Sequence, residues 1–163
     1  MRRLSRGGEV LVPRLDFPVQ FIDVRDLARW IVRAAEDQQQ GTCLASGDTS
    51  LDLGGLLSEI ARLNHTEVSA VEADDAWLEA QGVAPLTGLP LWMPEERGAF
   101  FTLDCGSARE RGLVTRPLEE TLLDVDAWDS LAALVHPETH RVGLAPRREA
   151  ELLRAWREQQ VPA

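Results

Sequence analysis

Short blocks of apolar residues, separated by polar and turn-forming residues, predict strands and helices in alternation along this chain. Residues 9–12 and 19–22 are apolar or β-branched runs bounded by prolines, and they predict two edge-type strands around a loop. After Asp23, apolar side chains recur at helical spacing along one face, which predicts a helix. Asp23 lies immediately before this helix and can cap its N-terminus. Residues 42–46 form a short apolar run that predicts a buried strand. The first part of the chain therefore has a strand, helix, strand pattern.

The alternation continues through the rest of the chain. Further helices are predicted over residues 52–63, 74–81, 104–112, 117–128 and 146–156, and further strands over residues 67–71 and 100–103. Residues 83–97 hold three prolines around Trp92, which predicts a structured loop of a kind that can cover a pocket. Alternating strands and helices are typical of an α/β protein.

Composition limits the classes of partner. The chain has 163 residues, of which 44% are hydrophobic and 27% charged, so it can bury one ordinary core. Its net charge is -10 and every basic residue is arginine, which argues against a nucleic-acid partner because phosphates would be repelled over most of the surface. No apolar stretch reaches the roughly 18 residues that a membrane span needs, and the basic start lacks the apolar core of a signal peptide. We therefore expect a cytoplasmic protein without membrane contact, whose cysteines are reduced.

Two motifs in the chain are similar to those of one known enzyme family. Residues 21–28 have the sequence F-I-D-V-R-D-L-A. This segment resembles the F-I-(H/D)-V-x-D-L-A signature of the extended short-chain dehydrogenases/reductases, the NAD-dependent epimerase/dehydratase family. In that family the signature precedes a helix and the last strand of the dinucleotide-binding sheet, which residues 29–37 and 42–46 match. Residues 104–128 resemble the family's ending, with G-L followed by P-L-E-E-T and a final Trp128.

The resemblance implies a fold, a division of the chain and a function. The expected fold is α/β, with a remnant of the C-terminal part of a Rossmann-type sheet in residues 1–50 and a small α+β substrate-binding domain in residues 51–163. The implied function is that of the substrate-binding C-terminal portion of an NAD(P)-dependent reductase or epimerase. A full-length relative would use NAD(P) as its cofactor.

The residues that carry the family's chemistry are not found in this chain. A Rossmann fingerprint needs glycines in G-x-x-G-x-x-G order between a strand and a helix, and neither the glycine pair at 7–8 nor the pair at 54–55 supplies it. The family's general acid is a Tyr whose pKa is lowered by a nearby Lys, and the chain contains no Tyr and no Lys. We therefore predict no catalytic and no cofactor-binding residue here, and no hydride transfer by this chain alone.

The missing half leaves several explanations and partners open. The chain starts where the family's second half begins, which fits a natural truncation, a split gene or an incomplete gene model. In the second case a separate Rossmann-bearing chain would complete the enzyme. The alternative function is a non-catalytic interaction module, because without the large sheet the first helix and residues 42–46 lack their expected cover. Such a module would associate with itself or with the separate Rossmann-bearing chain.

The resemblance places a substrate wall at Gln20, Asp23, Arg25 and Trp92, which we predict to bind a small molecule. Val19 stands where relatives that bind sugar nucleotides usually have an Arg, and this favours a different small carbonyl or alcohol substrate. The residues themselves also support a purely structural interpretation. Asp23 would then be a helix cap, with Asp26 in a capping-box arrangement and Arg25 as the partner of one of them.

Metal binding and a serine nucleophile are both disfavoured by local sequence. His136 and His140 are four residues apart, but Pro137 interrupts the helical turn between them and no third ligand pattern follows. We therefore predict an exposed loop there and no metal site. The G-x-S-x-G motif of a nucleophile elbow is absent from the sequence.

Overall fold

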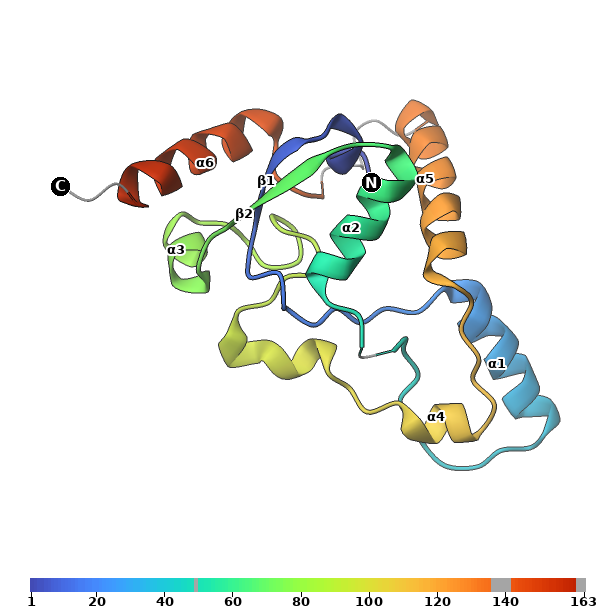
Figure 1. The fold of residues 1–163 in the computed structure, drawn as a ribbon. Coiled ribbons are helices and arrows are strands. Elements are labelled where there is room, and N and C mark those ends of the chain that lie inside the picture. The colour runs from blue at the N-terminus through green and yellow to red at the C-terminus, as the bar shows by residue number, and fades with distance from the viewer. Residues whose placement is uncertain (49, 136–141, 161–163) are drawn as a thin grey trace.

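The computed structural model describes residues 1–48, 50–135 and 142–160, and it has the mixed helix and strand content of an α/β protein (Figure 1). The strands are β1 (Gly8–Val12) and β2 (Val68–Glu72). The helices are α1 (Val24–Glu36), α2 (Leu53–Asn64), α3 (Asp75–Ala80), α4 (Gly106–Glu110), α5 (Leu118–Val135) and α6 (Pro146–Gln160), with 3-10 turns η1 (Leu4–Arg6) and η2 (Glu95–Phe101). None of the helices in these parts of the chain combines the length and the hydropathy that a membrane span requires.

The two strands form a parallel sheet whose register pairs Val10 with Ala70. β1 lies near the start of the chain and β2 about sixty residues later. The sheet therefore contains one strand from residues 1–50 and one from residues 51–163. β1 is the inner strand, since Val10, Leu11 and Val12 are buried, whereas β2 has no fully buried residue. The predicted strands at 9–12 and 67–71 are confirmed.

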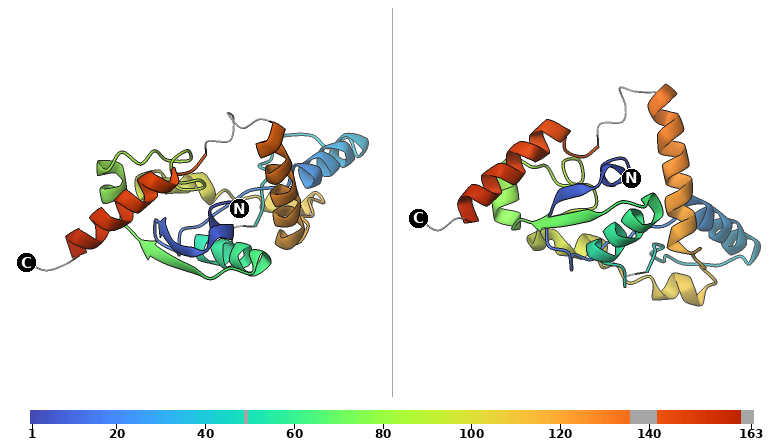
Figure 2. Two further views of the ribbon diagram at one scale, coloured as in Figure 1. Left: turned by 90° about the horizontal axis from the view of Figure 1, so that it is seen from above. Right: turned by 45° about the horizontal axis from the view of Figure 1, so that its top comes forward.

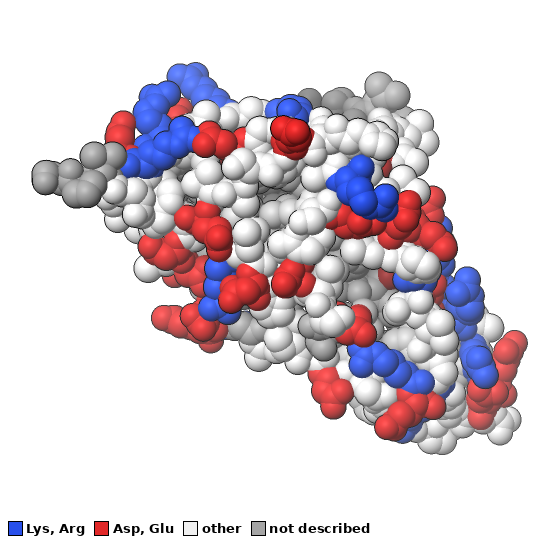
Figure 3. Space-filling model, viewed as in Figure 1, with Lys and Arg blue, Asp and Glu red and all other residues white. Residues whose placement is uncertain are grey.

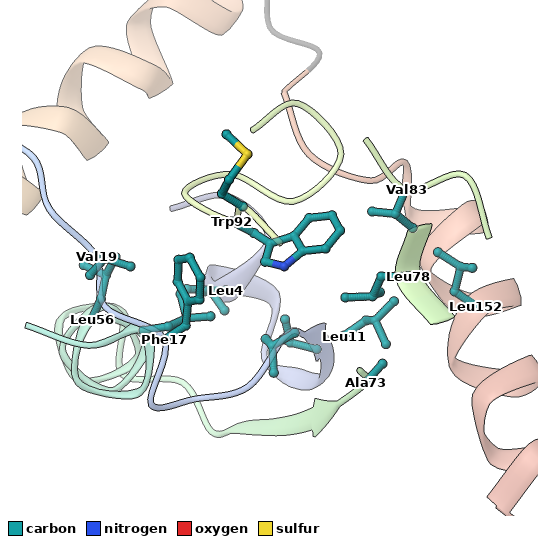
Figure 4. Close-up of a cluster of buried hydrophobic side chains, with 14 of the residues drawn as sticks. Leu4, Leu11, Phe17, Val19, Leu56, Ala73, Leu78, Val83, Trp92 and Leu152 are labelled. Atoms are coloured by element: carbon teal, nitrogen blue, oxygen red, sulfur yellow. The ribbon is translucent and has the colours of Figure 1, made fainter. Parts of the chain in front are cut away.

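A hydrophobic core surrounds β1 (Figure 4). Leu11, Leu78, Trp92 and Leu152 are its most deeply buried large side chains, and they come from β1, α3, the loop after α3 and α6. Trp156 on α6 adds an aromatic contact, with its ring 4.9 Å from that of Trp77. The core is thus built from segments spread along the chain.

Aspartate caps explain where three helices begin. Asp23 accepts a hydrogen bond from the amide of Arg25 at the start of α1. Asp52 and Asp74 cap α2 and α3 in the same way, at 2.7 Å in each case. Each carboxylate satisfies one of the amides that a helix N-terminus leaves without an internal partner. The predicted helix starts at these positions are confirmed.

Three predicted strands are wrong. Residues 19–22 and 42–46 have no strand pairing beyond an isolated bridge between Pro18 and Asp52, and the 100–103 prediction falls on the end of η2 and the residues after it. The reason is that an apolar run becomes a strand only when a neighbouring strand pairs with it, and β1 and β2 pair with each other. The 42–46 segment is extended but partly exposed, and Leu44 lies at the surface.

The molecule divides into two regions that differ in packing (Figures 1 and 2). The core region consists of η1, β1, α2, β2, α3, residues 83–94 and α6. We call the second region the α1 lobe; it comprises residues 21–48 and 102–117, which carry α1 and α4 and lie to one side of the sheet. α5 connects the two, since Leu122 belongs to the hydrophobic core while the start of α5 lies beside α1.

Candidate functional site

A cleft of about 260 Å³ lies where the α1 lobe meets the start of α2 and α5. Apolar side chains, including Val19, Phe21 and Leu118, line part of it. Its polar lining comes from Asp23, Asp26, Asp48, Ser50, Thr115, Arg116 and Thr121. The cleft therefore contains both aspartates of the F-I-D-V-R-D-L-A segment.

The close approach of two backbone segments shapes one wall of this cleft. Gly47 is buried, and a Cβ atom added at this position would lie 2.0 Å from the carbonyl oxygen of Phe21. Only a residue without a side chain permits this approach. Gly47, which follows the 42–46 segment, thus lies against Gln20 and Phe21 without any strand pairing.

Asp23 precedes α1 and accepts hydrogen bonds from both Arg25 and Thr121. Its Oδ1 accepts hydrogen bonds from the backbone amide and the Nε of Arg25, each at 2.9 Å, and its Oδ2 accepts one from the Thr121 hydroxyl at 2.9 Å. Arg116 lies 3.4 Å from the same oxygen. The hydrogen bonds from the Arg25 side chain hold the pKa of Asp23 well below its usual range, against the opposing effect of burial.

Asp26 connects α1 to the segment that precedes α5. Its side chain is 1% exposed, and it accepts bonds from the backbone amide of Arg116 at 2.8 Å and from the Nη2 and Nε of that residue at 2.8 Å and 3.0 Å. The Arg116 side chain lowers the pKa of Asp26. Asp26 thus binds Arg116 instead of completing a capping box at the start of α1.

Arg25 pairs with Asp23 on one side and with Asp124 of α5 on the other. The interpretation of Arg25 as the partner of a capping aspartate is confirmed. Its guanidinium is partly exposed, at 44% of the side chain. In this structure the Asp23 carboxylate and the Arg25 guanidinium form hydrogen bonds with each other. A substrate role for these two residues stays a prediction.

Gln20 links separate segments of the chain in this structure through hydrogen bonds of its side-chain amide. Its side chain is buried, and its amide nitrogen donates to the carbonyl oxygens of Gly47 at 3.1 Å and Leu103 at 2.9 Å. Its amide oxygen accepts from the backbone amide of Leu103 at 3.0 Å. Because these bonds use both ends of the amide, Gln20 joins three chain segments and presents no free polar group to the cleft.

Trp92 lies in the loop that the surrounding prolines predicted, and this loop packs onto the core. It is 0% exposed and lies within the main core, where Figure 4 shows it among Leu11, Leu78 and Val83. Its indole nitrogen donates to Asp75 of α3 at 2.9 Å. Residues 83–94 fold back onto the core, so this tryptophan packs against the protein and is separate from the cleft around Asp23.

Sequence reasoning missed the cleft residues that α5 and its approach supply, Arg116 and Thr121. They lie about ninety residues after the aspartates that they contact. An Arg before a proline at a helix start carries no local sign of such a contact. Only the packing of α5 beside α1 shows that Arg116 donates hydrogen bonds to Asp26 and that Thr121 donates one to Asp23.

The arrangement suits binding better than proton transfer. Two carboxylates with lowered pKa values stay ionised near neutral pH and are weak bases, whereas a general acid or base needs a pKa near the working pH. The cleft can accept hydrogen bonds from hydroxyl or amine groups. Within the described residues, no group of three or more His, Cys, Asp or Glu side chains is placed to hold a metal, and His136 and His140 lie outside those residues.

Comparison with known proteins assigns no family. No protein-family model matches the chain, and a search of curated proteins finds no significant match.

Proposed function

We propose that this chain is the substrate-binding C-terminal portion of an NAD(P)-dependent reductase or epimerase of the extended short-chain type, and that it transfers no hydride alone. On this proposal residues 1–50 include the remnant of a Rossmann-type sheet, and the remainder binds a small carbonyl or alcohol substrate. The observation that carries the proposal is the coincidence of the F-I-D-V-R-D-L-A segment with the cleft. Asp23 and Asp26, its two acidic residues, both line that cleft.

The apolar side chains of α1 are only partly covered, which supports the proposal. Ile31 and Val32 are 54% and 58% exposed, and Leu44 of the following extended segment is also at the surface. An amphipathic helix of a globular protein normally packs its apolar face on a sheet or on other helices. A Rossmann-type sheet on a separate polypeptide would supply such a cover.

The residues present do not fit NAD(P). The glycines at 54 and 55 lie in the first turn of α2, but there the Asp52 carboxylate accepts the Gly55 amide at 2.7 Å, so a negative charge occupies the place that a pyrophosphate would need. Gly7 and Gly8 both have positive φ angles, but Gly7 precedes β1 and Gly8 begins it, so this glycine pair leads into a strand and not into a helix. A cofactor would therefore be held by the second polypeptide.

The proposed compartment is the cytoplasm. Cys43 and Cys105 are both free in the structure, and Cys105 is buried. Unpaired cysteines suit a reducing compartment.

The test combines cofactor binding with complementation. We expect titration of the chain with NADH or NADPH, followed by nicotinamide fluorescence, to show no binding in the micromolar range. Submicromolar affinity would overturn the proposal. Mixing the chain with a Rossmann-bearing polypeptide from the same genome that carries the Tyr and Lys should produce oxidation of the reduced nicotinamide by a small aldehyde or ketone.

A second candidate function is a non-catalytic interaction module that associates with itself or with another chain. The exposure of the apolar positions on α1 favours it. Sedimentation velocity shows whether the chain associates with itself, and binding of a hydrophobic dye shows whether the apolar surface of α1 is exposed. A compact monomer that binds no dye would count against the module.

A further inference from the structure

The two outer edges of the small sheet differ in whether side chains bind their outward backbone groups. On the β1 side, the backbone amide of Leu11 donates to the buried carboxylate of Glu149, at 3.3 Å. Arg3 pairs with that carboxylate and donates to the carbonyl oxygens of Glu9 and, at 3.0 Å, Gly7. The outward-facing groups of β1 are therefore satisfied by side chains, and α6 covers this edge.

Within the part of the chain that the structure describes, the β2 side has no comparable cover. The amide of Ala73 donates to Val12 and the amide of Gly8 donates to Glu67, which sets the parallel ladder so that the backbone groups of Val68, Ala70 and Glu72 point away from β1. No hydrogen bond within the described residues reaches the backbone of these three positions from outside the sheet. Figure 2 shows α6 and β2 on opposite sides of β1, so the helix that covers one edge is remote from the other.

The charge around the open edge defines the partner that fits it. Residues 66–78 contain no basic residue but four acidic ones, namely Glu67, Glu72, Asp74 and Asp75. Among the ion pairs of the described residues, none involves any of these four carboxylates. Figure 3 shows acidic side chains where β2 leads into α3, whereas basic side chains gather over α6.

A second copy of this chain is a poor occupant of the edge. Antiparallel pairing of β2 with itself would bring the acidic segments 67–75 of two copies together, with no basic residue in either segment to offset their charge. Like charges near each other across a strand pair are destabilising. An extended segment with basic side chains avoids this repulsion, and its backbone would satisfy the outward groups of β2.

We propose that the outer edge of β2 binds an extended, basic segment of another polypeptide as a third strand. The backbone of Val68, Ala70 and Glu72 supplies the hydrogen bonds. The negative charge of the four neighbouring carboxylates, of which Asp74 and Asp75 also hold α3 and Trp92, favours lysine or arginine side chains. This proposal does not depend on the function proposed above, because the β2 edge lies away from the cleft and from α1.

The test uses an acetylated, amidated peptide of alternating Lys and Val as the probe and NMR of the labelled chain as the readout. We expect the peptide to shift the amide signals of Val68, Ala70 and Glu72 most. A peptide with Glu in place of Lys should bind at least tenfold more weakly. Equal binding of the two peptides, shifts centred elsewhere, or no binding at millimolar peptide would overturn the proposal.

Two variants separate backbone pairing from general attraction. Ala70→Pro removes an outward amide but no bond to β1, and proline is tolerated at such edge positions, so we expect at least a tenfold loss of peptide binding. Ala70→Val keeps the amide and should bind like the unchanged chain. If Ala70→Pro does not fold, the same peptide with alternate amides N-methylated serves instead, and undiminished binding in either experiment would contradict strand addition.

Discussion

The core region and the α1 lobe contain similar amphipathic helices but hold them in different ways. In the core region Leu78 of α3 and Leu152 of α6 are both fully buried against β1 and its neighbours. In the lobe the one fully buried residue of α1 is Asp26, while Ile31 on its apolar positions remains exposed. An amphipathic pattern thus predicts a helix in both regions, but its burial depends on whether a covering surface is available.

Polar contacts position α1 alongside hydrophobic packing that is only partial, since Leu27 and Trp30 are half-buried. Besides the Asp26 and Arg116 pair, the indole nitrogen of Trp30 donates to the carbonyl oxygen of Arg111 at 3.2 Å, and Gln39 donates to the same oxygen at 3.2 Å. A net hydrogen bond contributes about 1 kcal/mol, which is less than the burial of one large apolar side chain. The lobe is therefore expected to open more easily than the core region.

The largest expected difference between the regions concerns truncation of apolar side chains. Leu78→Ala should lower the free energy of unfolding by about 3 kcal/mol, because it leaves a cavity in a closely packed core. Ile31→Ala should change it by less than about 0.5 kcal/mol, because the side chain is already half exposed. Urea unfolding followed by circular dichroism measures both values. Similar losses for the two variants would show that the α1 face is covered in solution.

The polar attachment of the lobe gives the next largest effect. Asp26→Asn keeps the size of the side chain but removes its charge, and we expect a loss of about 2 kcal/mol, since hydrogen bonds to buried charges contribute more than neutral ones. The matched control is Asp124→Asn, which weakens an exposed pair with Arg25 and should cost less than about 0.5 kcal/mol. Hydrogen exchange of the α1 amides should accelerate in the first variant only. An equal effect of the two variants would contradict the assigned role of Asp26.

Acid should weaken the same attachment in a defined direction. The pKa values of Asp23 and Asp26 are lowered in the folded chain, so their contribution is complete above the ordinary aspartate pKa of about 3.9 and is lost progressively as the pH falls below it. Both carboxylates face Arg116, and Asp23 also faces Arg25 and Thr121. Thermal unfolding between pH 7 and pH 3 should show the loss, and Asp26→Asn should reduce its size. A stability that rose as the pH fell from 5 to 3 would be inconsistent with this account.

The sequence predicted those parts of the fold whose causes are local. The aspartate caps at residues 23, 52 and 74 were predictable because a cap and the amide that it accepts lie within three residues of each other. The runs at 19–22 and 42–46 were not, because a strand requires a partner whose position local pattern does not reveal. Trp92 was predicted to lie in a structured loop, but its burial in the core depends on contacts with distant segments that local pattern does not reveal.

The candidate site was predicted only in part. Asp23 and Arg25 were identified together with their mutual pairing, which lies within two residues of sequence. Arg116 completes the cleft from a distance of ninety residues, and Gln20 is tied to Leu103 from eighty-three residues away. Contacts of this range depend on how α5 and η2 pack beside the α1 lobe. That packing is determined by residues along the whole chain and not by a local pattern.

The central claim, that this chain binds a substrate but does not itself move a hydride, is tested most directly by a turnover measurement. The purified chain is incubated with NADPH or NADH and a panel of small aldehydes and ketones, and nicotinamide absorbance is followed without any second polypeptide. The account predicts a rate equal to that of buffer alone. Sustained, protein-dependent oxidation of the nicotinamide would contradict it.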